Sequence, residues 1–193
     1  MEAAKLISQK DLDKIYRQEV KDKGGQAAFE RALHNKTLHH GKKDSRRSIF
    51  LCHSHRDKTI IAKTFAFFDR LNAELYVDWM DEGLPKVPDQ RTAQSIHTKI
   101  KDCNKFLFLA TARALESKWC SWELGLAYSI KGHKEFAILP IGTRDGKWNG
   151  NEYLHLYPVI DTQQLDMENL REDNLSVSYP DEQKISFLDW LRQ

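Results

Sequence analysis

The stretch that decides the fold is Phe106-Leu-Phe-Leu-Ala110, in which every residue is apolar. Such a run predicts a strand that is covered on both faces, as in a parallel sheet packed between two layers of helices. Four further short apolar runs predict strands on either side of it. They are Ser48-Ile-Phe-Leu-Cys52, Glu74-Leu-Tyr-Val-Asp78, Phe136-Ala-Ile-Leu-Pro-Ile141 and Pro158-Val-Ile-Asp161.

The segments between these strands have the spacing of amphipathic helices. Apolar residues recur three or four positions apart around Ile61–Phe68, Ala93–Ile100 and Ser117–Ile130, and Ile185, Leu188 and Leu191 predict a closing helix. Single helices between strands indicate right-handed βαβ units. We therefore expect an α/β fold with a flavodoxin-like five-stranded parallel sheet of order 2-1-3-4-5 and helices on both faces. Its ligand crevice would lie at the carboxyl ends of the first and third strands, bordered by the loop 79–90.

The first 47 residues differ in character from the rest, so we divide the chain into an N-terminal helical extension with a linker (1–47) and one domain (48–193). Leu12, Ile15 and Tyr16 predict one helix, Gly24-Gly25 stops it, and a second helix follows. Neither helix is long enough to be stable alone, so both should dock on the body or on another subunit. The extension carries 12 Lys and Arg against 7 Asp and Glu, but no aromatic residues interleave with its basic cluster, so nucleic-acid binding is not expected.

Composition sets further limits. The chain has 193 residues, of which 40% are hydrophobic and 30% charged, typical of a folded domain. No apolar run suits a membrane span, and the first residues lack the apolar stretch of a secretory signal. Three cysteines without a CxxC pair favour free thiols and a cytoplasmic location. Cys52-His-Ser-His55 has metal-capable side chains, but no second ligand pair stands at a familiar spacing, so we expect no metal site.

The most informative polar residue is Glu123, in Ser117-Lys-Trp-Cys-Ser-Trp-Glu123. Ser117 can cap the helix, which places Glu123 on its second turn near the strand ends, with Trp119 on the same face. A carboxylate beside an aromatic ring at this point of the sheet suits a ligand site. The alternatives are a solvated surface carboxylate for Glu123 and a supporting role for Trp119. For Trp122 we expect a place in the core.

Two segments resemble the Toll/interleukin-1 receptor (TIR) domain family of the bacterial type. Phe50-Leu-Cys-His-Ser-His-Arg-Asp-Lys58 is similar to the family's first box, and Ser117–Glu123 to its S-x-W-C-x-x-E segment. The loop 79–90 stands where the family has its BB loop. Cys52 replaces the usual Ser of the first box, and Leu84-Pro85 with Val87-Pro88 replaces the Pro-Gly of the BB loop.

The resemblance implies an enzyme that cleaves the nicotinamide–ribose bond of NAD+, with Glu123 as the catalytic residue. NAD+ is then the substrate, no separate cofactor is needed, and the chain forms a homo-oligomer through TIR–TIR contacts, in antiphage defence. Its product, linear or cyclic, stays open. Two alternatives remain: a non-catalytic adaptor that acts by homotypic assembly, and a nucleoside 2-deoxyribosyltransferase-like enzyme, which also uses a Glu. The residues that the resemblance assigns to substrate binding are His53, Ser54, Arg56, Asp78, Trp79 and Trp119.

Overall fold

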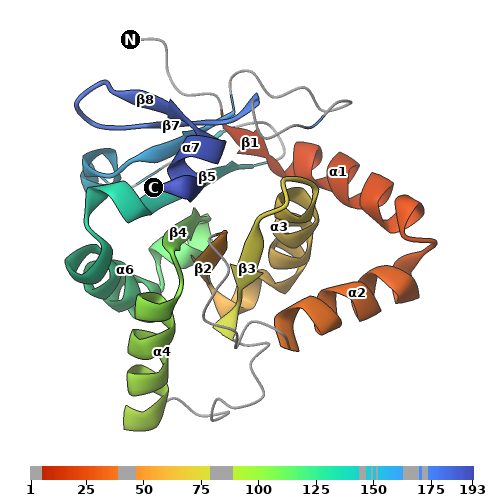
Figure 1. Cartoon of the computed structure of the whole chain (residues 1–193), viewed down its shortest axis with the longest axis horizontal. Helices are drawn as coiled ribbons and strands as arrows, with labels where there is room; N and C mark the ends of the chain where they lie inside the picture. The colour runs from red at the N-terminus through yellow and green to blue at the C-terminus, as the bar shows by residue number, and fades with distance from the viewer. Residues whose placement is uncertain are drawn as a thin grey trace.

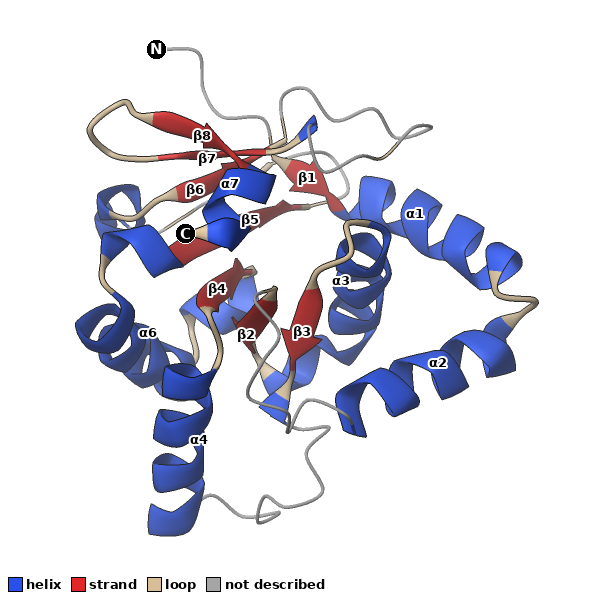
Figure 2. Ribbon diagram, viewed as in Figure 1, coloured by secondary structure: helices blue, strands red, loops and turns tan. Residues whose placement is uncertain are grey.

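A twisted sheet forms the centre of the molecule, with helices on both of its faces (Figure 1; Figure 2). The computed structural model describes residues 6–38, 47–78, 89–143, 147–148, 150, 152–162, 170 and 174–193. The strands are β1 (Ile7–Ser8), β2 (Ser48–Cys52), β3 (Glu74–Tyr76), β4 (Lys105–Ala110), β5 (Phe136–Gly142), β6 (Val159–Asp161), β7 (Ser176–Ser178) and β8 (Lys184–Ser186). The α-helices are α1 (Gln9–Asp22), α2 (Gln26–Leu38), α3 (Lys58–Arg70), α4 (Gln90–Asp102), α5 (Ala112–Leu115), α6 (Lys118–Lys131) and α7 (Phe187–Arg192).

The parallel part of the sheet has the order β3-β2-β4-β5-β6, which confirms the predicted order 2-1-3-4-5. The five predicted strands make up this parallel order, and within the described residues the sheet has three more strands. β7 and β8 extend it as an antiparallel pair beyond β6, and β1 pairs with β5. These three additional strands have two or three residues each, too few for an apolar or alternating pattern to stand out.

The closing helix begins later than its apolar spacing suggested. Ile185 belongs to β8, and α7 starts at Phe187. Ser186 sets this start, because its hydroxyl accepts a hydrogen bond from the backbone N–H of Asp189 at 3.0 Å. Ile185 therefore has the apolar spacing of the predicted helix but lies in the strand β8, just before that helix begins.

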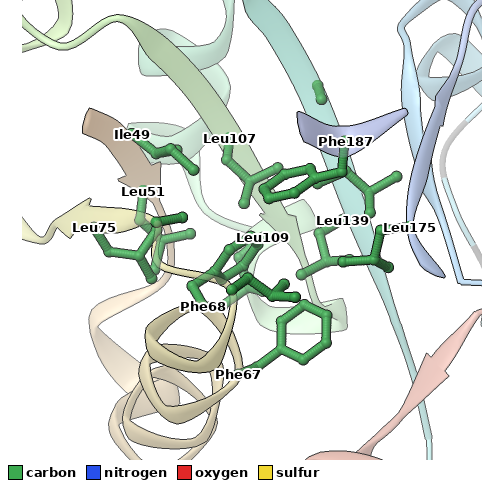
Figure 3. Packing of buried hydrophobic residues seen from close by; sticks show 14 of the residues in the cluster. Ile49, Leu51, Phe67, Phe68, Leu75, Leu107, Leu109, Leu139, Leu175 and Phe187 are labelled. Carbon is green, nitrogen blue, oxygen red and sulfur yellow. The ribbon is translucent and has the colours of Figure 1, made fainter. Parts of the chain in front are cut away.

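Side chains alternate between the two faces of the central strands and build two apolar layers. One layer joins the strands to α1, α3 and α7, and Figure 3 shows ten of its residues by label, among them Leu107, Leu109 and Phe68. The other joins Phe106 and Phe108 to α4 and α6. Burial on both faces explains why β4 is apolar along nearly its whole length.

The N-terminal helices dock on the body of this same chain, which answers one of the alternatives left open by the sequence. Leu12 and Ile15 of α1 are buried in the layer that contains α3. Arg70 of α3 donates to Glu19 of α1 at 2.7 Å, and Lys63 lies 2.5 Å from Asp13. Gly24 has a positive φ of 84° and follows the end of α1, as the double glycine predicted. α2 extends to Leu38, and residues 39–46, where the linker is predicted to end, lie outside the described residues.

None of the helices in the described part of the chain combines the length and the apolar character that a bilayer crossing requires.

Candidate active site

The candidate site lies at the carboxyl ends of the parallel strands, between the end of β2 and the start of α6. Ser117 begins α6 by accepting a hydrogen bond from the backbone N–H of Cys120 at 3.3 Å. The thiol of Cys120 donates to the carbonyl of His53 at 3.2 Å, and the thiol of Cys52 lies 3.8 Å from the carbonyl of Cys120. These contacts join the first turn of α6 to the residues that follow β2, and they place Glu123 beside Cys52.

Glu123 is buried, with only 3% of its surface exposed. Loss of solvent raises the pKa of its carboxyl well above the usual value, and the nearby negative charge of Asp78 raises it further. Hydrogen bonds from the Cys52 thiol and the Trp119 side chain oppose this shift. The carboxyl group is thus held by two side chains in a desolvated place, with a like charge as its electrostatic neighbour.

Asp78 follows β3 and faces two histidines from the segment after β2. Its Oδ2 lies 3.1 Å from Nε2 of His55, and its Oδ1 lies 3.3 Å from Nε2 of His53. The second pair is close but is not aligned as a hydrogen bond, so Nε2 of His53 is buried without a hydrogen-bond partner. Burial lowers the pKa of His53, whereas the hydrogen bond to Asp78 raises the pKa of His55.

The structure brings most of the predicted site residues to this edge. Glu123, His53, Ser54 and Asp78 are buried there. Trp119 is half-buried and contacts Glu123. The roles of all these residues toward a ligand stay predictions.

Other predicted residues lie apart from that cluster. Arg56 is exposed on the turn after Ser54, and its backbone carbonyl accepts a hydrogen bond from Arg113 at 2.6 Å. Trp79 and the rest of the loop up to residue 88 lie outside the described residues. The prediction of Trp122 as a core residue was wrong, because it is 40% exposed and packs on Trp119, with 5.0 Å between ring centroids.

Sequence reasoning missed a polar network that joins the two loops of the switch point. The hydroxyl of Thr111, after β4, donates to the buried carboxylate of Asp57 at 2.5 Å. The same hydroxyl accepts from the backbone N–H of Ala114 at 3.0 Å and so begins α5. The available signal was a polar residue in the segment that follows each of two neighbouring strands, because the carboxyl ends of parallel strands meet at one edge. The sequence marks Cys52 only as a departure from the family pattern, whereas in the structure its thiol contacts Glu123.

A cavity of about 450 Å³ lies at the opposite edge of the sheet, near the start of β5 and the turn between β7 and β8. Its lining includes His133, Tyr179 and Gln193. It therefore does not coincide with the crevice that the strand order predicts, whose bordering loop (79–88) lies outside the described residues.

An α/β sheet of this order, with a buried carboxyl group at its switch point, defines a flavodoxin-like protein that has a candidate ligand site at the strand ends. Comparison with protein families narrows this class: residues 49–176 match the model described as the TIR domain. The chain belongs to the TIR domain family, as the two sequence boxes predicted.

Two relatives extend the comparison. A Bacillus cereus (strain MSX-D12) protein named "Probable 3' cyclic ADP-D-ribose synthase ThsB'" is 30% identical over 150 residues, which cover 75% of each chain. A Cytobacillus dafuensis protein named "Putative cyclic ADP-D-ribose synthase TIR2" is 27% identical over 104 residues, covering 52% of this chain but 27% of that protein. Both names describe enzymes that make a cyclic ADP-ribose.

Proposed function

We propose that this chain is an NAD+ nucleosidase, of the glycohydrolase or cyclase type, that cleaves the bond between nicotinamide and ribose. The observation that carries the proposal is the buried carboxyl group of Glu123 at the carboxyl edge of the sheet. Membership of the TIR family and the names of the two relatives support the same reaction.

The chemistry of NAD+ explains why a single carboxylate suffices. A glycosidase that cleaves an O-glycoside needs a general acid to protonate the leaving oxygen, and therefore uses two carboxyl groups. In NAD+ the leaving nitrogen already carries a positive charge, so nicotinamide departs as a neutral molecule when the bonding electrons move to that nitrogen. The ribose C1′ becomes cationic, and stabilising this charge is the main task left to the protein.

The ionised form of Glu123 would stabilise that cation. Electrostatic interactions are stronger in a desolvated site than in water, and a carboxylate that hydrogen-bonds to the ribose hydroxyls gains most in the transition state. The raised pKa of Glu123 works against ionisation in the free chain. The positive nicotinamide ring of bound NAD+ favours the ionised form, because an opposite charge nearby lowers the pKa of a carboxyl group.

Capture of the ribosyl cation decides the product. Attack by water at C1′, with loss of a proton, gives ADP-ribose, whereas attack by a hydroxyl or by the adenine of the same molecule gives a cyclic ADP-ribose. The names of the relatives favour a cyclic product, which would act as a signal in antiphage defence.

The remaining site residues are assigned by chemistry. Trp119 would contact the nicotinamide or ribose beside Glu123, and Arg56 would bind the diphosphate because a guanidinium binds phosphate oxygens well. His53, Ser54 and Asp78 would surround the ribose. The buried free thiols of all three cysteines support a reducing, cytoplasmic setting.

Assembly is part of the proposal. In the TIR family a neighbour's BB loop completes the site, so activity should depend on a homo-oligomer and rise with protein concentration. A specific activity that stays constant across a wide dilution series would contradict this part of the proposal.

The decisive experiment incubates the full chain with NAD+ and measures nicotinamide, ADP-ribose and cyclic products by chromatography and mass spectrometry. Release of nicotinamide with a matching amount of one ADP-ribose product supports the proposal. If concentrated protein leaves NAD+ intact, the reaction is wrong and a non-catalytic adaptor explains the fold. Exchange of the base of a deoxynucleoside in place of NAD+ cleavage would indicate a nucleoside 2-deoxyribosyltransferase-like enzyme.

A further inference from the structure

Three side chains at the strand ends bring metal-capable atoms together. His53, His55 and Asp78 each offer one such atom, and all three atoms lie within 4.8 Å of one another. The residues come from two chain segments, because the histidines follow β2 and Asp78 follows β3. The sequence alone shows no second ligand pair at a familiar spacing from the histidines. The pairing of β2 with β3 brings one further ligand, Asp78, to them.

The hydrogen bonding of His53 prepares it as a metal ligand. Its Nδ1 lies 2.9 Å from the carbonyl of Leu51, which can only accept, so Nδ1 carries the proton. In the neutral ring Nε2 then has a lone pair, and it is buried without a hydrogen-bond partner while an oxygen of Asp78 lies 3.3 Å away. A metal-binding histidine usually donates the N–H of its other ring nitrogen to a carbonyl or carboxylate in this way.

A lone pair that faces a carboxylate oxygen is unfavourable unless a proton or a metal cation lies between the two atoms, and burial of His53 disfavours the protonated ring. The spacing suits such an ion. Zinc bonds of about 2.0–2.1 Å in a tetrahedron place neighbouring ligand atoms roughly 3.3 Å apart. Oδ1 of Asp78 lies 3.3 Å from Nε2 of His53, and Oδ2 lies 3.1 Å from Nε2 of His55, both near that spacing. Taken as one ligand atom from each residue, the set lies within 4.8 Å, so a small side-chain adjustment brings all three atoms onto one ion.

The exposed side chain of His55 gives a metal ion a route from solvent to these three atoms. This side chain is 56% exposed, whereas His53 and Asp78 are buried. An ion can therefore reach the cluster from the solvent side while two of its ligands are held in place by the strand ends. The imidazoles of His53 and His55 are nearly parallel, with an interplanar angle of 14° and 5.7 Å between centroids, so that their Nε2 atoms face the same carboxylate.

We propose that His53, His55 and Asp78 bind a divalent transition metal of the zinc class through the two Nε2 atoms and the Asp78 carboxylate. Two imidazoles and one carboxylate are a ligand set that leaves the fourth tetrahedral position for an exogenous oxygen ligand. This inference goes beyond the proposed reaction, which needs no metal. It does not depend on that reaction, although the two proposals share His53 and Asp78.

The test is a calorimetric titration of the full chain with Zn²⁺ after dialysis against a chelator, in the absence of NAD+. The wild type should bind one equivalent. His55→Ala should weaken binding by at least about ten-fold. Loss of a residue that only supports a metal ligand already costs about that much, and loss of a ligand should cost no less. His97→Ala is the matched control, because His97 is an exposed histidine on α4, and it should bind as the wild type does.

Because His55 is exposed, its removal should leave the fold intact, and thermal unfolding of each variant checks this. Asp78→Asn gives a second test, since it keeps the shape of the side chain and removes the anionic ligand. It should also weaken binding at least about ten-fold. Loss of binding in His55→Ala alone supports the site even if Asp78→Asn does not fold.

The free cysteines are the competing ligands, so Co²⁺ serves as a spectroscopic probe of ligand type. Ligation by imidazole and carboxylate gives visible bands of tetrahedral cobalt without the intense near-ultraviolet band of a thiolate complex. A thiolate band, no binding, or equal binding by the wild type and His55→Ala would overturn the proposal. A chain that releases nicotinamide but binds no Zn²⁺ would overturn this site alone, whereas Zn²⁺ binding without NAD+ cleavage would support the site and contradict the proposed reaction.

Discussion

Charged residues are arranged in opposite ways at the α1–α3 interface and at the carboxyl edge of the sheet. At the interface, Glu19 lies 2.7 Å from Arg70 and 3.0 Å from Lys23, so its buried negative charge is paired twice. At the carboxyl edge, Glu123 is buried near Asp78, and that like charge helps to raise its pKa. The charge of Glu19 is therefore balanced by two cations. In contrast, no cation is among the groups that shift the pKa of Glu123.

This difference separates structural from chemical use of a carboxyl group. A buried carboxylate beside two cations contributes to docking of α1, because the desolvation cost is offset by charge pairing. A buried carboxyl group beside another carboxylate opposes folding, and such groups concentrate at functional sites. Substitution of Glu123 should therefore change mainly the activity. Substitution of a residue at the α1–α3 interface should change mainly the stability.

The largest expected effect is on catalysis. Glu123→Gln keeps the size of the side chain but removes its charge, so the rate of nicotinamide release should fall by roughly 10²–10³, the loss typical for one electrostatic stabilising group. Glu74→Gln makes the same change at an exposed carboxyl group at the start of β3 and should have no effect. Equal rates in Glu123→Gln and the wild type would show that Glu123 is not the catalytic residue.

The next effect is on stability, at the interface. Arg70→Met leaves the buried Glu19 with one cation in place of two, so the free energy of unfolding should fall by about 1–3 kcal/mol. For a chain of this length the melting temperature should fall by roughly 2–4 °C for each kcal/mol.

The control is Arg17→Met, at an exposed arginine of α1, and thermal unfolding by circular dichroism is the measurement. The specific activity of folded Arg70→Met should equal that of the wild type. If Arg70→Met and Arg17→Met unfold at the same temperature, the ion pair between Arg70 and Glu19 does not stabilise the fold.

A smaller stability change of the opposite sign is expected at the carboxyl edge. The folded-state pKa of Glu123 is raised, so its contribution to stability is present at low pH and is lost as pH rises through that pKa. Glu123→Gln does not ionise and should be more stable than the wild type at pH 8, by about 1 kcal/mol, with less advantage at pH 5. Melting temperatures at both pH values measure this, and a destabilised Glu123→Gln at pH 8 would count against it.

The smallest expected effect is on the pH dependence of nicotinamide release. Because the ionised fraction of Glu123 grows as pH rises through a raised pKa, the acid limb of kcat/KM should lie above the usual Glu range of about 4.3. Asp78→Asn removes the negative charge near Glu123, so the acid limb of the kcat/KM profile should move to lower pH. This shift is separate from any change in the absolute value of KM. Asp181→Asn, at an exposed residue of the opposite edge, should leave the limb in place.

The sequence predicted those features that depend on strong local patterns. The apolar runs of β2, β4 and β5 predicted the central strands, and their alternation with single helices predicted the parallel order. The cap at Ser117 correctly placed Glu123 on the second turn of α6. Short β1, β7 and β8 carry too few residues for such a pattern.

The sequence did not predict which side chains contact one another across neighbouring strands. The register that pairs Phe50 with Tyr76 brings the residues after β2 beside Asp78, and no local pattern encodes that register. Trp122 was misplaced because Trp119, three positions earlier, fills the inward place on α6 and leaves the second ring outside.

The titration of the Glu123 side-chain carboxyl group, followed by NMR of its carboxyl carbon, tests the contrast between the two regions most directly. The signal is assigned by its loss in Glu123→Gln. The account predicts a midpoint above the usual value of about 4.3 and a lower midpoint in Asp78→Asn. A wild-type midpoint at or below that usual value would contradict it, because Glu123 would then be as well stabilised in its ionised form as a paired carboxylate.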